Sequence, residues 1–325
     1  MDVVVSVMMS TYNGEKYIGD AIKSVLSQSF SNFEFLITDD ASTDSTVELI
    51  EAFKDNRIIL IKNKYRKGLT ANLIEMQKKA KGKYLARLDS DDLSDSHRIE
   101  YQVDFLNNNK NCVMVCSYAK VFGDKMGTIK TPSRFEDLKV ALLFYNPIVH
   151  SSVMLRNNCN LFYDASFLKA QDYALWDYVV EKGFRIACIP KKLVSFRCHQ
   201  SQISNNGKKE QNTYRNIIIR RALSRLSIVL DSSRENIWFR FLSGETNFSI
   251  NEINLIVDVL IKIQRNNRKI GLYNQNALSK RLEHYYICLY LIVKRAGYRF
   301  EHNQFIKSKI PFYKRFIISL RRYMR

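Results

Sequence analysis

The sequence predicts an α/β fold in which a mostly parallel sheet is flanked by helices and followed by a helical C-terminal appendage. Three observations lead to this prediction. Short apolar runs alternate with helical patterns of roughly 10 to 15 residues through the first half of the chain. Clusters of polar residues follow the ends of these runs. Basic residues are concentrated beyond residue 205, where helical spacing dominates.

The first elements specify the parallel part of the sheet. The continuous apolar run 3–9 suits a strand that is buried on both faces. Apolar residues recur at helical spacing in the segments between the strands, and strands joined by helices form right-handed crossovers in a parallel sheet. The further strands are expected at 33–38, 58–61 and 84–88, and the helices at 15–28, around 47–53 and at 68–80.

The later elements are expected to complete the sheet and build the appendage. A strand at 112–117 precedes an exposed hairpin tip at 123–127 and a helix at 135–144. Two closing strands are expected at 185–189 and 193–198. A linker near 205–209 would divide a domain 1–205 from a mainly helical region 206–325. Helices in that region are expected at 217–230, 250–263 and 282–293, with an amphipathic tail at 305–325.

Charge divides the chain in the same way. Residues 206–325 hold 24 Lys and Arg against 8 Asp and Glu, a net +16 of the total +19, so the first 205 residues carry only +3. A basic appendage on a nearly neutral domain is expected to seek an anionic partner. The 46% hydrophobic content indicates a globular chain, and its apolar runs fall short of the roughly 18 residues that a spanning helix needs.

Cellular location is predicted from two further features. The first residues lack the basic and small-residue pattern of a signal peptide. The six cysteines form no CxxC pair, which favours reduced thiols in a cytoplasmic protein over a disulfide framework or a zinc site. Oligomeric state is not predicted.

The stretch 83–92 is the strongest chemical signal. An apolar strand runs directly into Asp89, Asp91 and Asp92, and three carboxylates so close together need a positive charge to neutralise them. Mg²⁺ or Mn²⁺ with substrate phosphates would supply it. The alternative is a solvated acidic loop that caps the next helix through Ser94 or Asp95.

Two other polar clusters also follow strand ends. Asn13 comes after the first strand and Asp39–Asp40 after the second, and ligands collect at this edge of parallel sheets. Neither GxGxxG nor GxxxxGK[ST] occurs, which disfavours dinucleotide-binding and P-loop proteins. The three clusters therefore predict a nucleotide-type ligand with a metal at the third.

Five collinear segments carry a family resemblance over residues 1–205. They are Val-Ser-Val-Met-Met-Ser-Thr-Tyr-Asn-Gly at 5–14, Ser-Val-Leu-Ser-Gln-Ser-Phe at 24–30, Asp-Asp-Ala-Ser-Thr-Asp at 39–44, Lys-Gly-Lys-Tyr at 81–84 and Leu-Asp-Ser-Asp-Asp at 88–92. Together they resemble family 2 glycosyltransferases of the bacterial surface-polysaccharide type, which have the GT-A fold, a Rossmann-like, mostly parallel sheet. The resemblance implies an inverting, metal-dependent transferase that uses a nucleotide-diphosphate sugar, most often a UDP-sugar.

The resemblance assigns expected roles at the donor side. Thr11 and Asn13 match the turn against the nucleoside, and Asp40 matches the carboxylate that reads the uracil ring. Asp89 and Asp91 match the DxD pair, with Asp91 on the Mn²⁺ or Mg²⁺ ion and Asp89 near the ribose or the metal waters. Helix capping is the alternative for Asp39 and Asp40. Leu73-Ile74 replaces the Leu-Asn of many members, so a sugar contact from that helix is not expected, although Asn72 is nearby.

Asp172 is expected to be the catalytic base. An inverting transfer needs a group opposite the leaving diphosphate to take the proton of the acceptor hydroxyl. The family places a Glu-Asp pair at this point, whereas this chain has Gln171 before Asp172. A single charge should raise the pKa of the base less than a like-charged pair would. The alternative is that Asp172 caps the helix that follows it.

The remaining candidates are secondary. The ending Arg197-Cys198-His199 is similar to the family's Arg-x-His, which makes His199 a second candidate for the metal or the diphosphate. Trp176 is a candidate for stacking on a sugar or, alternatively, a core residue, and His150 is a structural or diphosphate-adjacent candidate. Possible contacts with the donor or acceptor are assigned to Arg87, Asp92, His150, Trp176 and Arg197.

The tail 305–325 is expected to lie on a membrane. Apolar residues recur every three or four positions, basic residues fill the gaps, and no acidic residue follows position 302. Such a helix suits an anionic inner leaflet; the alternative is a helix packed on the catalytic domain. The chain is therefore expected to extend a lipid-diphosphate-linked saccharide, peripherally bound on the cytoplasmic side. The competing functions are a sugar-nucleotide nucleotidyltransferase, which lacks its Gly- and Arg-rich loop here, and nucleic-acid binding, which is not expected.

Overall fold

The computed structural model describes residues 2–199, 207–297 and 308. The chain forms two compact units, the first made of Met1–Leu138 and Asn146–Ile218 and the second of Lys139–Tyr145 and Ile219–Arg325. The predicted domain boundary at residue 205 lies outside the described residues. The predicted tail 305–325 also lies outside them, except for Ser308.

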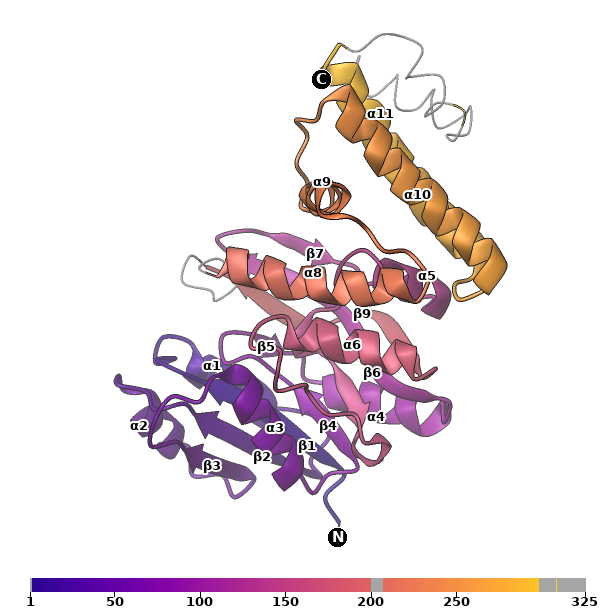
Figure 1. Ribbon diagram of the computed structural model, residues 1–325. Coiled ribbons are helices and arrows are strands. Elements are labelled where there is room, and N and C mark those ends of the chain that lie inside the picture. Colours follow the sequence, from indigo (N-terminus) through magenta and orange to yellow (C-terminus); the bar gives the residue numbers. More distant parts are fainter. Residues whose placement is uncertain (1, 200–206, 298–307, 309–325) are drawn as a thin grey trace. The chain divides into compact units, whose positions relative to one another are not determined.

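Four parallel strands form one half of the sheet in the first unit. Strands β1 (Val5–Thr11), β2 (Phe33–Asp39), β3 (Ile58–Lys62) and β4 (Tyr84–Arg87) lie in the order β3-β2-β1-β4 (Figure 1). All seven residues of β2 are buried, as expected of a strand covered on both faces. Thr11 pairs with Asp39, so β1 and β2 end at the same edge of the sheet. This confirms the predicted parallel half.

The other half of the sheet is mixed. Strand β8 (Met154–Arg156) pairs antiparallel with β4 and with β6 (Cys112–Gly123), and β6 is parallel to β9 (Arg185–Cys198). The short strands β5 (Leu93–Ser94) and β7 (Gly127–Ile129) pair antiparallel with β9 and β6. The predicted hairpin tip at 123–127 is confirmed. The two predicted closing strands are wrong in one respect, because they form a single strand in which a register shift against β6 accommodates Pro190 and Lys191.

Helices of the first unit connect and cover the strands. The helix α1 (Ile18–Leu26) buries Ile18, Ala21, Ile22 and Val25 in the core that also contains residues of β1 and β2. The others in this part of the chain are α2 (Thr46–Glu51), α3 (Leu69–Lys79), α4 (Arg98–Asn108), α5 (Phe135–Ala141), α6 (Gln171–Glu181) and α8 (Lys208–Ser224), with short 3-10 turns at His150–Ser152 and Asn157–Cys159. Helices α5 and α8 continue into the second unit.

The second unit is helical. It contains α9 (Ser232–Leu242), α10 (Ile250–Ile270) and α11 (Gln275–Arg295), and α10 begins with a capping box between Ser249 and Glu252. Phe144 contacts Trp238 and Tyr285 in its aromatic core. Helix α9 is absent from the prediction, although Asp231 caps it through the Arg234 amide. Among the described residues, no helix is both long and apolar enough to cross a membrane.

Candidate active site

The turn after β1 is tied to the loop after β2. Asn13 has a φ of 49°, in the left-handed region that asparagine tolerates better than most residues. Its amide N–H donates to Ser42 Oγ at 2.9 Å, and its Oδ1 accepts from the Thr43 amide at 2.9 Å. The predicted nucleoside-binding turn is therefore a fixed part of the sheet edge.

Asp40 lies beside this turn and is rich in hydrogen bonds. Its Oδ1 accepts from Asn63 Nδ2 at 2.9 Å and from the Lys67 amide at 2.8 Å, and its Oδ2 accepts from the Gly68 amide at 2.9 Å. Burial alone would raise the pKa of Asp40, but the hydrogen bonds from Lys67, Asn72, Asn63 and Gly68 bring it below its usual value. The carboxylate therefore stays ionised and anchors segment 63–68.

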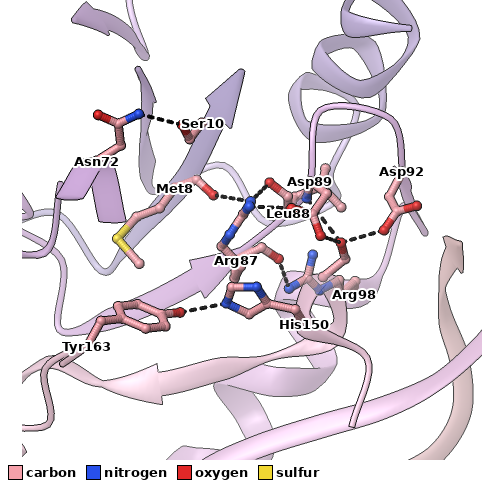
Figure 2. Close-up of polar contacts among 11 residues, drawn as sticks. Met8, Ser10, Asn72, Arg87, Leu88, Asp89, Asp92, Arg98, His150 and Tyr163 are labelled. Atoms are coloured by element: carbon pink, nitrogen blue, oxygen red, sulfur yellow. Dashed lines mark hydrogen bonds and ion pairs between the residues drawn. The ribbon is translucent and has the colours of Figure 1, made fainter. Parts of the chain in front are cut away.

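Two buried oxygens near Asp40 lack hydrogen bonds within the described part of the chain. They are Thr11 Oγ1 and Asp39 Oδ1, on residues that pair across β1 and β2. Buried polar atoms normally have a partner, so these two are candidates for contact with a ligand or ordered water. Asn72 differs, because its side chain donates to Ser10 Oγ at 3.0 Å (Figure 2) and accepts from Asn63 Nδ2 at 2.8 Å. Asn72 is buried and serves the scaffold.

Arg87 ends β4 and contacts Asp89 directly. Its guanidinium donates to the carbonyls of Met8 and Leu88 and forms an ion pair with the Asp89 carboxylate (Figure 2). The Arg87 side chain has no exposed surface. The predicted contact of Arg87 with donor or acceptor is therefore wrong, and Arg87 acts through Asp89. Burial would raise the pKa of Asp89, but the Arg87 and His150 interactions and the Ser151 hydroxyl lower it.

Ser151 joins two of the three acidic side chains. Its Oγ accepts from the Asp89 amide at 3.0 Å and lies 2.9 Å from Asp89 Oδ2 and 2.5 Å from Asp92 Oδ2. A hydroxyl has one hydrogen and cannot donate to both carboxylates. Burial and the charges of Asp89 and Asp91 raise the pKa of Asp92 well above its usual value. Ser151 therefore bridges the two acidic side chains and donates its single hydrogen to one of them at a time.

Asp92 is fully buried, which corrects the prediction that it contacts donor or acceptor. Its Oδ1 accepts from the Arg197 amide at 2.8 Å, and Arg197 Nε donates to the Asp91 carbonyl at 2.8 Å. These bonds lock the end of β9 onto the acidic loop. The Arg197 guanidinium also lies 4.4 Å from the Tyr17 ring centroid, a cation–π distance.

Arg98 is a buried member of this site that the sequence analysis missed. Its Nη2 donates to the Arg87 carbonyl at 2.7 Å (Figure 2) and to the Val153 carbonyl at 3.1 Å. Its Nε donates to Gln102 Oε1 at 3.1 Å. Burial and the neighbouring Arg87 charge lower the pKa of Arg98 to about 9. A signal was available, because Arg98 and Gln102 stand on the same face of α4 as the buried Ile99 and Leu106.

Asp91 and His199 form the partly open edge of the cluster. Asp91 Oδ2 lies 3.0 Å from His199 Nε2, and these side chains are 27% and 14% exposed. Burial and the Asp89 charge raise the pKa of Asp91, against the effect of His199. The described residues contain no group of three or more His, Cys, Asp or Glu arranged to hold a metal. One carboxylate and one imidazole fit a divalent cation that keeps its other positions for water and phosphate oxygens.

His150 and Trp176 lie behind the acidic loop. His150 Nε2 is 2.7 Å from the Tyr163 hydroxyl (Figure 2), and burial and the Arg87 charge lower the pKa of His150 to about 3. A neutral imidazole supplies no charge to a diphosphate, which favours the structural role. Trp176 is fully buried with its ring centroid 6.0 Å from that of His150. Its predicted stacking on a sugar is wrong, and the alternative of a core residue is correct.

Asp172 stands in the first turn of α6. Ala170, at a φ of 53°, turns the chain into the helix, and Gln171 is buried. Asp172 Oδ2 accepts from Asn146 Nδ2 at 2.7 Å. The pKa of Asp172 is raised to about 6, mainly by burial and in smaller part by the Asp89 charge. A carboxyl group with this pKa can take up and release a proton near neutral pH.

The predicted residues thus form two connected groups. Asp91, Asp92, Arg197 and His199 are joined by direct contacts, and Asp89 joins them through the Ser151 hydroxyl. Besides burial, the charges of Asp89 and Asp172 both raise the pKa of the Tyr163 hydroxyl. The Asp40 group is linked to β1 through Asn63, Asn72 and Ser10, and the same strand accepts from Arg87 at Met8. Strand β1 therefore connects the two groups.

Comparison with known proteins identifies a matching family. Residues 6–173 match the model of glycosyl transferase family 2. An uncharacterized glycosyltransferase of Haemophilus influenzae is 34% identical over 226 residues, which span 64% of this chain and 70% of that protein. The Escherichia coli UDP-Glc:alpha-D-GlcNAc-diphosphoundecaprenol beta-1,3-glucosyltransferase WfaP is 32% identical over 219 residues, 66% of this chain and 85% of that protein.

A solved structure shares the fold. The crystal structure of Staphylococcus aureus TarS 1-349 in complex with UDP-GlcNAc matches 92% of this chain and 93% of its own, with a TM-score of 0.60 and 17% sequence identity. At this identity the match supports the predicted GT-A fold and nothing finer.

Proposed function

This chain belongs to glycosyl transferase family 2, and from that premise we propose that it moves a sugar from a UDP-sugar to a saccharide carried on a lipid diphosphate. The donor and acceptor classes are supported by WfaP, whose name gives UDP-Glc and a diphosphoundecaprenol-linked GlcNAc. The ionised Asp40 supports a nucleoside at this edge, as do the neighbouring Thr11 and Asp39 oxygens, which accept no hydrogen bond from the described residues. Residues 1–205 would carry the catalysis.

The observation that carries the proposal is the environment of Asp172. Its half-buried carboxyl group has its pKa raised to about 6 and interacts electrostatically with the Asp89 group. The ionised form would accept the proton of the acceptor hydroxyl as that oxygen forms a bond to the anomeric carbon. The bond from this carbon to the diphosphate would break, and its electron pair would leave with the nucleotide. One direct displacement inverts the configuration at the anomeric carbon.

Asp91 and His199 are the residues that would hold Mn²⁺ or Mg²⁺. A bound cation supplies positive charge that stabilises the departing diphosphate. Around it, Arg197 would hold the acidic loop in place through the Asp91 carbonyl and Asp92. Arg87 would keep the Asp89 carboxylate oriented and ionised at the ribose side.

A panel of nucleotide sugars tests the reaction class. Thermal unfolding is measured with UDP-, GDP-, CDP- and dTDP-sugars, in Mn²⁺, in Mg²⁺ and in EDTA, followed by assay of nucleotide release. We expect UDP-sugars to raise the unfolding temperature most, and the effect to fall in EDTA. Equal protection by all four nucleotides, or nucleotide release that is unchanged in EDTA, would contradict the proposed donor or the proposed metal.

The basic region 206–325 would bring the enzyme to the inner face of the cell membrane, where a lipid-linked acceptor lies. The support is the +16 charge of this region and the amphipathic pattern of residues 305–325. Flotation with phosphatidylglycerol vesicles, compared with neutral vesicles, tests it in the full chain. Replacing Lys314, Arg315, Arg321 and Arg322 with Gln should reduce recovery at least threefold. Unchanged recovery, or tighter salt-dependent binding to DNA than to vesicles, would reject membrane docking.

A further inference from the structure

Asn146 is the side chain that faces the Asp172 carboxylate from outside helix α6. It lies in the segment between α5 and the 3-10 turn His150–Ser152, and its Nδ2 is 2.7 Å from Asp172 Oδ2. Its own Oδ1 accepts from the Ile148 amide at 3.1 Å. A backbone N–H can only donate, so the Asn146 oxygen must face Ile148 and its NH₂ group must face Asp172.

The backbone around Asn146 is also fixed. Thr131 Oγ1 donates to the Pro147 carbonyl at 2.8 Å, and Thr131 is 1% exposed. Proline restricts the backbone of the residue before it, which is Asn146. The amide is therefore presented to Asp172 in one orientation.

We propose that Asn146 is a positioning residue that directs one oxygen of Asp172 and stabilises its ionised form, so that Asp172 is a competent base at neutral pH. The inference rests on the proposed role of Asp172 as the base. Asn146 does not touch the reacting atoms in this account. It occupies one acceptor position on Oδ2 of the carboxylate, and the acceptor hydroxyl would approach another.

The surroundings of Asp172 contain groups that raise its pKa and groups that lower it, and Asn146 is one of those that lower it. Burial and the Asp89 charge raise the pKa of Asp172, whereas the Tyr173 amide and Asn146 lower it. Tyr163, before α6, interacts with Asp172 and has a raised pKa of its own, so it stays neutral. Arg215 of α8 interacts electrostatically with Tyr173, and the Arg87 charge lowers the pKa of Tyr163 against the effect of burial. Among these groups, Asn146 is the side chain that donates a hydrogen bond to the carboxylate.

Two substitutions separate positioning from simple packing. Asn146→Ala removes the donor, and a hydrogen bond to a charged group of this kind is equivalent to about one pH unit in the pKa of Asp172. Asn146→Asp keeps the shape but places a second carboxyl group against Asp172, which should shift the pKa of Asp172 further upward. A packing role predicts the opposite order, because the isosteric Asp would disturb the fold less than Ala.

The test measures urea unfolding from pH 4.5 to 8 for the wild type, Asn146→Ala and Asn146→Asp, each with and without Asp172→Asn. The difference within each pair reports the pH at which Asp172 titrates in the folded protein. We expect about 6 for the wild type, about one unit higher for Asn146→Ala, and higher again for Asn146→Asp. Asn157→Ala is the matched control, because Asn157 is equally half-buried and donates through Nδ2 to the Gly82 carbonyl at 3.0 Å.

The inference would be overturned if Asp172 titrated at the same pH in the wild type and in both Asn146 variants. It would also be overturned if Asn157→Ala shifted the titration of Asp172 as much as Asn146→Ala does. The turnover of Asp172→Asn is measured in parallel with the donor that the nucleotide-sugar panel selects. Retained turnover would reject Asp172 as the base and hence the proposed mechanism. Lost turnover with an unmoved titration midpoint would reject only the role of Asn146.

Discussion

Asp40 and Asp172 are two carboxyl groups of the first unit, one buried and the other half-buried, that have opposite surroundings. Asp40 accepts from two backbone amides and the Asn63 side chain, and its pKa is lowered. Asp172 accepts from one side chain, lies near the Asp89 charge, and its pKa is raised to about 6. Burial raises the pKa of both groups. At Asp40 the hydrogen bonds outweigh this effect, whereas at Asp172 the effect of burial prevails.

This difference assigns different tasks to the two groups. A carboxylate held ionised by several donors suits a fixed recognition element, because it does not exchange its proton near neutral pH. A carboxyl group with few donors suits a base, because its proton affinity is close to the working pH. The comparison leads to four predictions, given from the largest expected effect to the smallest.

Asp172→Asn should lower turnover at least about 100-fold, because the amide cannot accept the proton of the acceptor hydroxyl. Binding of UDP, measured by calorimetry, should stay within about threefold of the wild type. Asp104→Asn, an exposed change on α4, is the control and should leave both quantities unchanged. If Asp172→Asn kept more than about a tenth of the wild-type turnover, Asp172 would not be the base, and the proposed difference in role between Asp172 and Asp40 would be rejected.

Asp40→Asn should weaken UDP binding about tenfold, since the Asn NH₂ group cannot accept from the amide it would face and segment 63–68 loses an anchor. Turnover at saturating donor should fall less than affinity. The measurement is calorimetric titration with UDP beside a steady-state assay. An unchanged dissociation constant for UDP would show that the Asp40 carboxylate does not contribute to nucleotide binding.

Ser151→Ala should lower turnover about fivefold, because Asp89 and Asp92 lose the hydroxyl they share. The control is Ser152→Ala, since Ser152 is as fully buried but its hydroxyl donates to the Val149 carbonyl at 2.7 Å. Both variants should be less stable, and only Ser151→Ala should lose turnover relative to the amount of folded protein. Equal losses in the two variants would mean that Ser151 contributes only to folding.

The two carboxyl groups should affect stability in opposite directions. Because the pKa of Asp172 is raised on folding, this residue makes its full contribution to stability below pH 4 and loses it as the pH rises to about 6. Asp172→Asn should therefore stabilise the protein above pH 6 by about 1 to 3 kcal/mol. A lowered pKa means that ionised Asp40 stabilises the fold above its unfolded pKa, so Asp40→Asn should destabilise it at pH 7. Urea unfolding at pH 5 and pH 7 measures both effects. Changes of the same sign at pH 7 would contradict the comparison.

The strands that position the site were predictable from the sequence. The continuous apolar runs at β1 to β4 leave little choice of secondary structure, and their polar ends identified Asp40, Asp89 and Asp91. Helix α9 was missed because its apolar residues, Ile237 to Phe239 and Phe241, are adjacent in sequence and give a weak helical period. Strand β9 was divided in two because the sequence does not reveal the register shift that accommodates Pro190 and Lys191.

The depth of each site residue was not predictable. Arg87, Asp92 and Trp176 stand next to the residues that were expected to contact substrate, yet all three are fully buried. Their partners come from distant segments, such as Ser151, which lies 59 residues from Asp92, and the Arg197 amide, which lies 105 residues away. Sequence spacing identifies which loops meet, but it does not show which side chains form the inner layer of the site.

The pH dependence of turnover by the unmodified chain tests the central claim most directly. With saturating donor and acceptor, the rate should rise from acid pH with its half-maximal value near pH 6, as the Asp172 carboxyl group loses its proton. A rate that is constant from pH 8 down to pH 5, in protein that remains folded, would contradict the account, because a base with this pKa would already be largely protonated at pH 5.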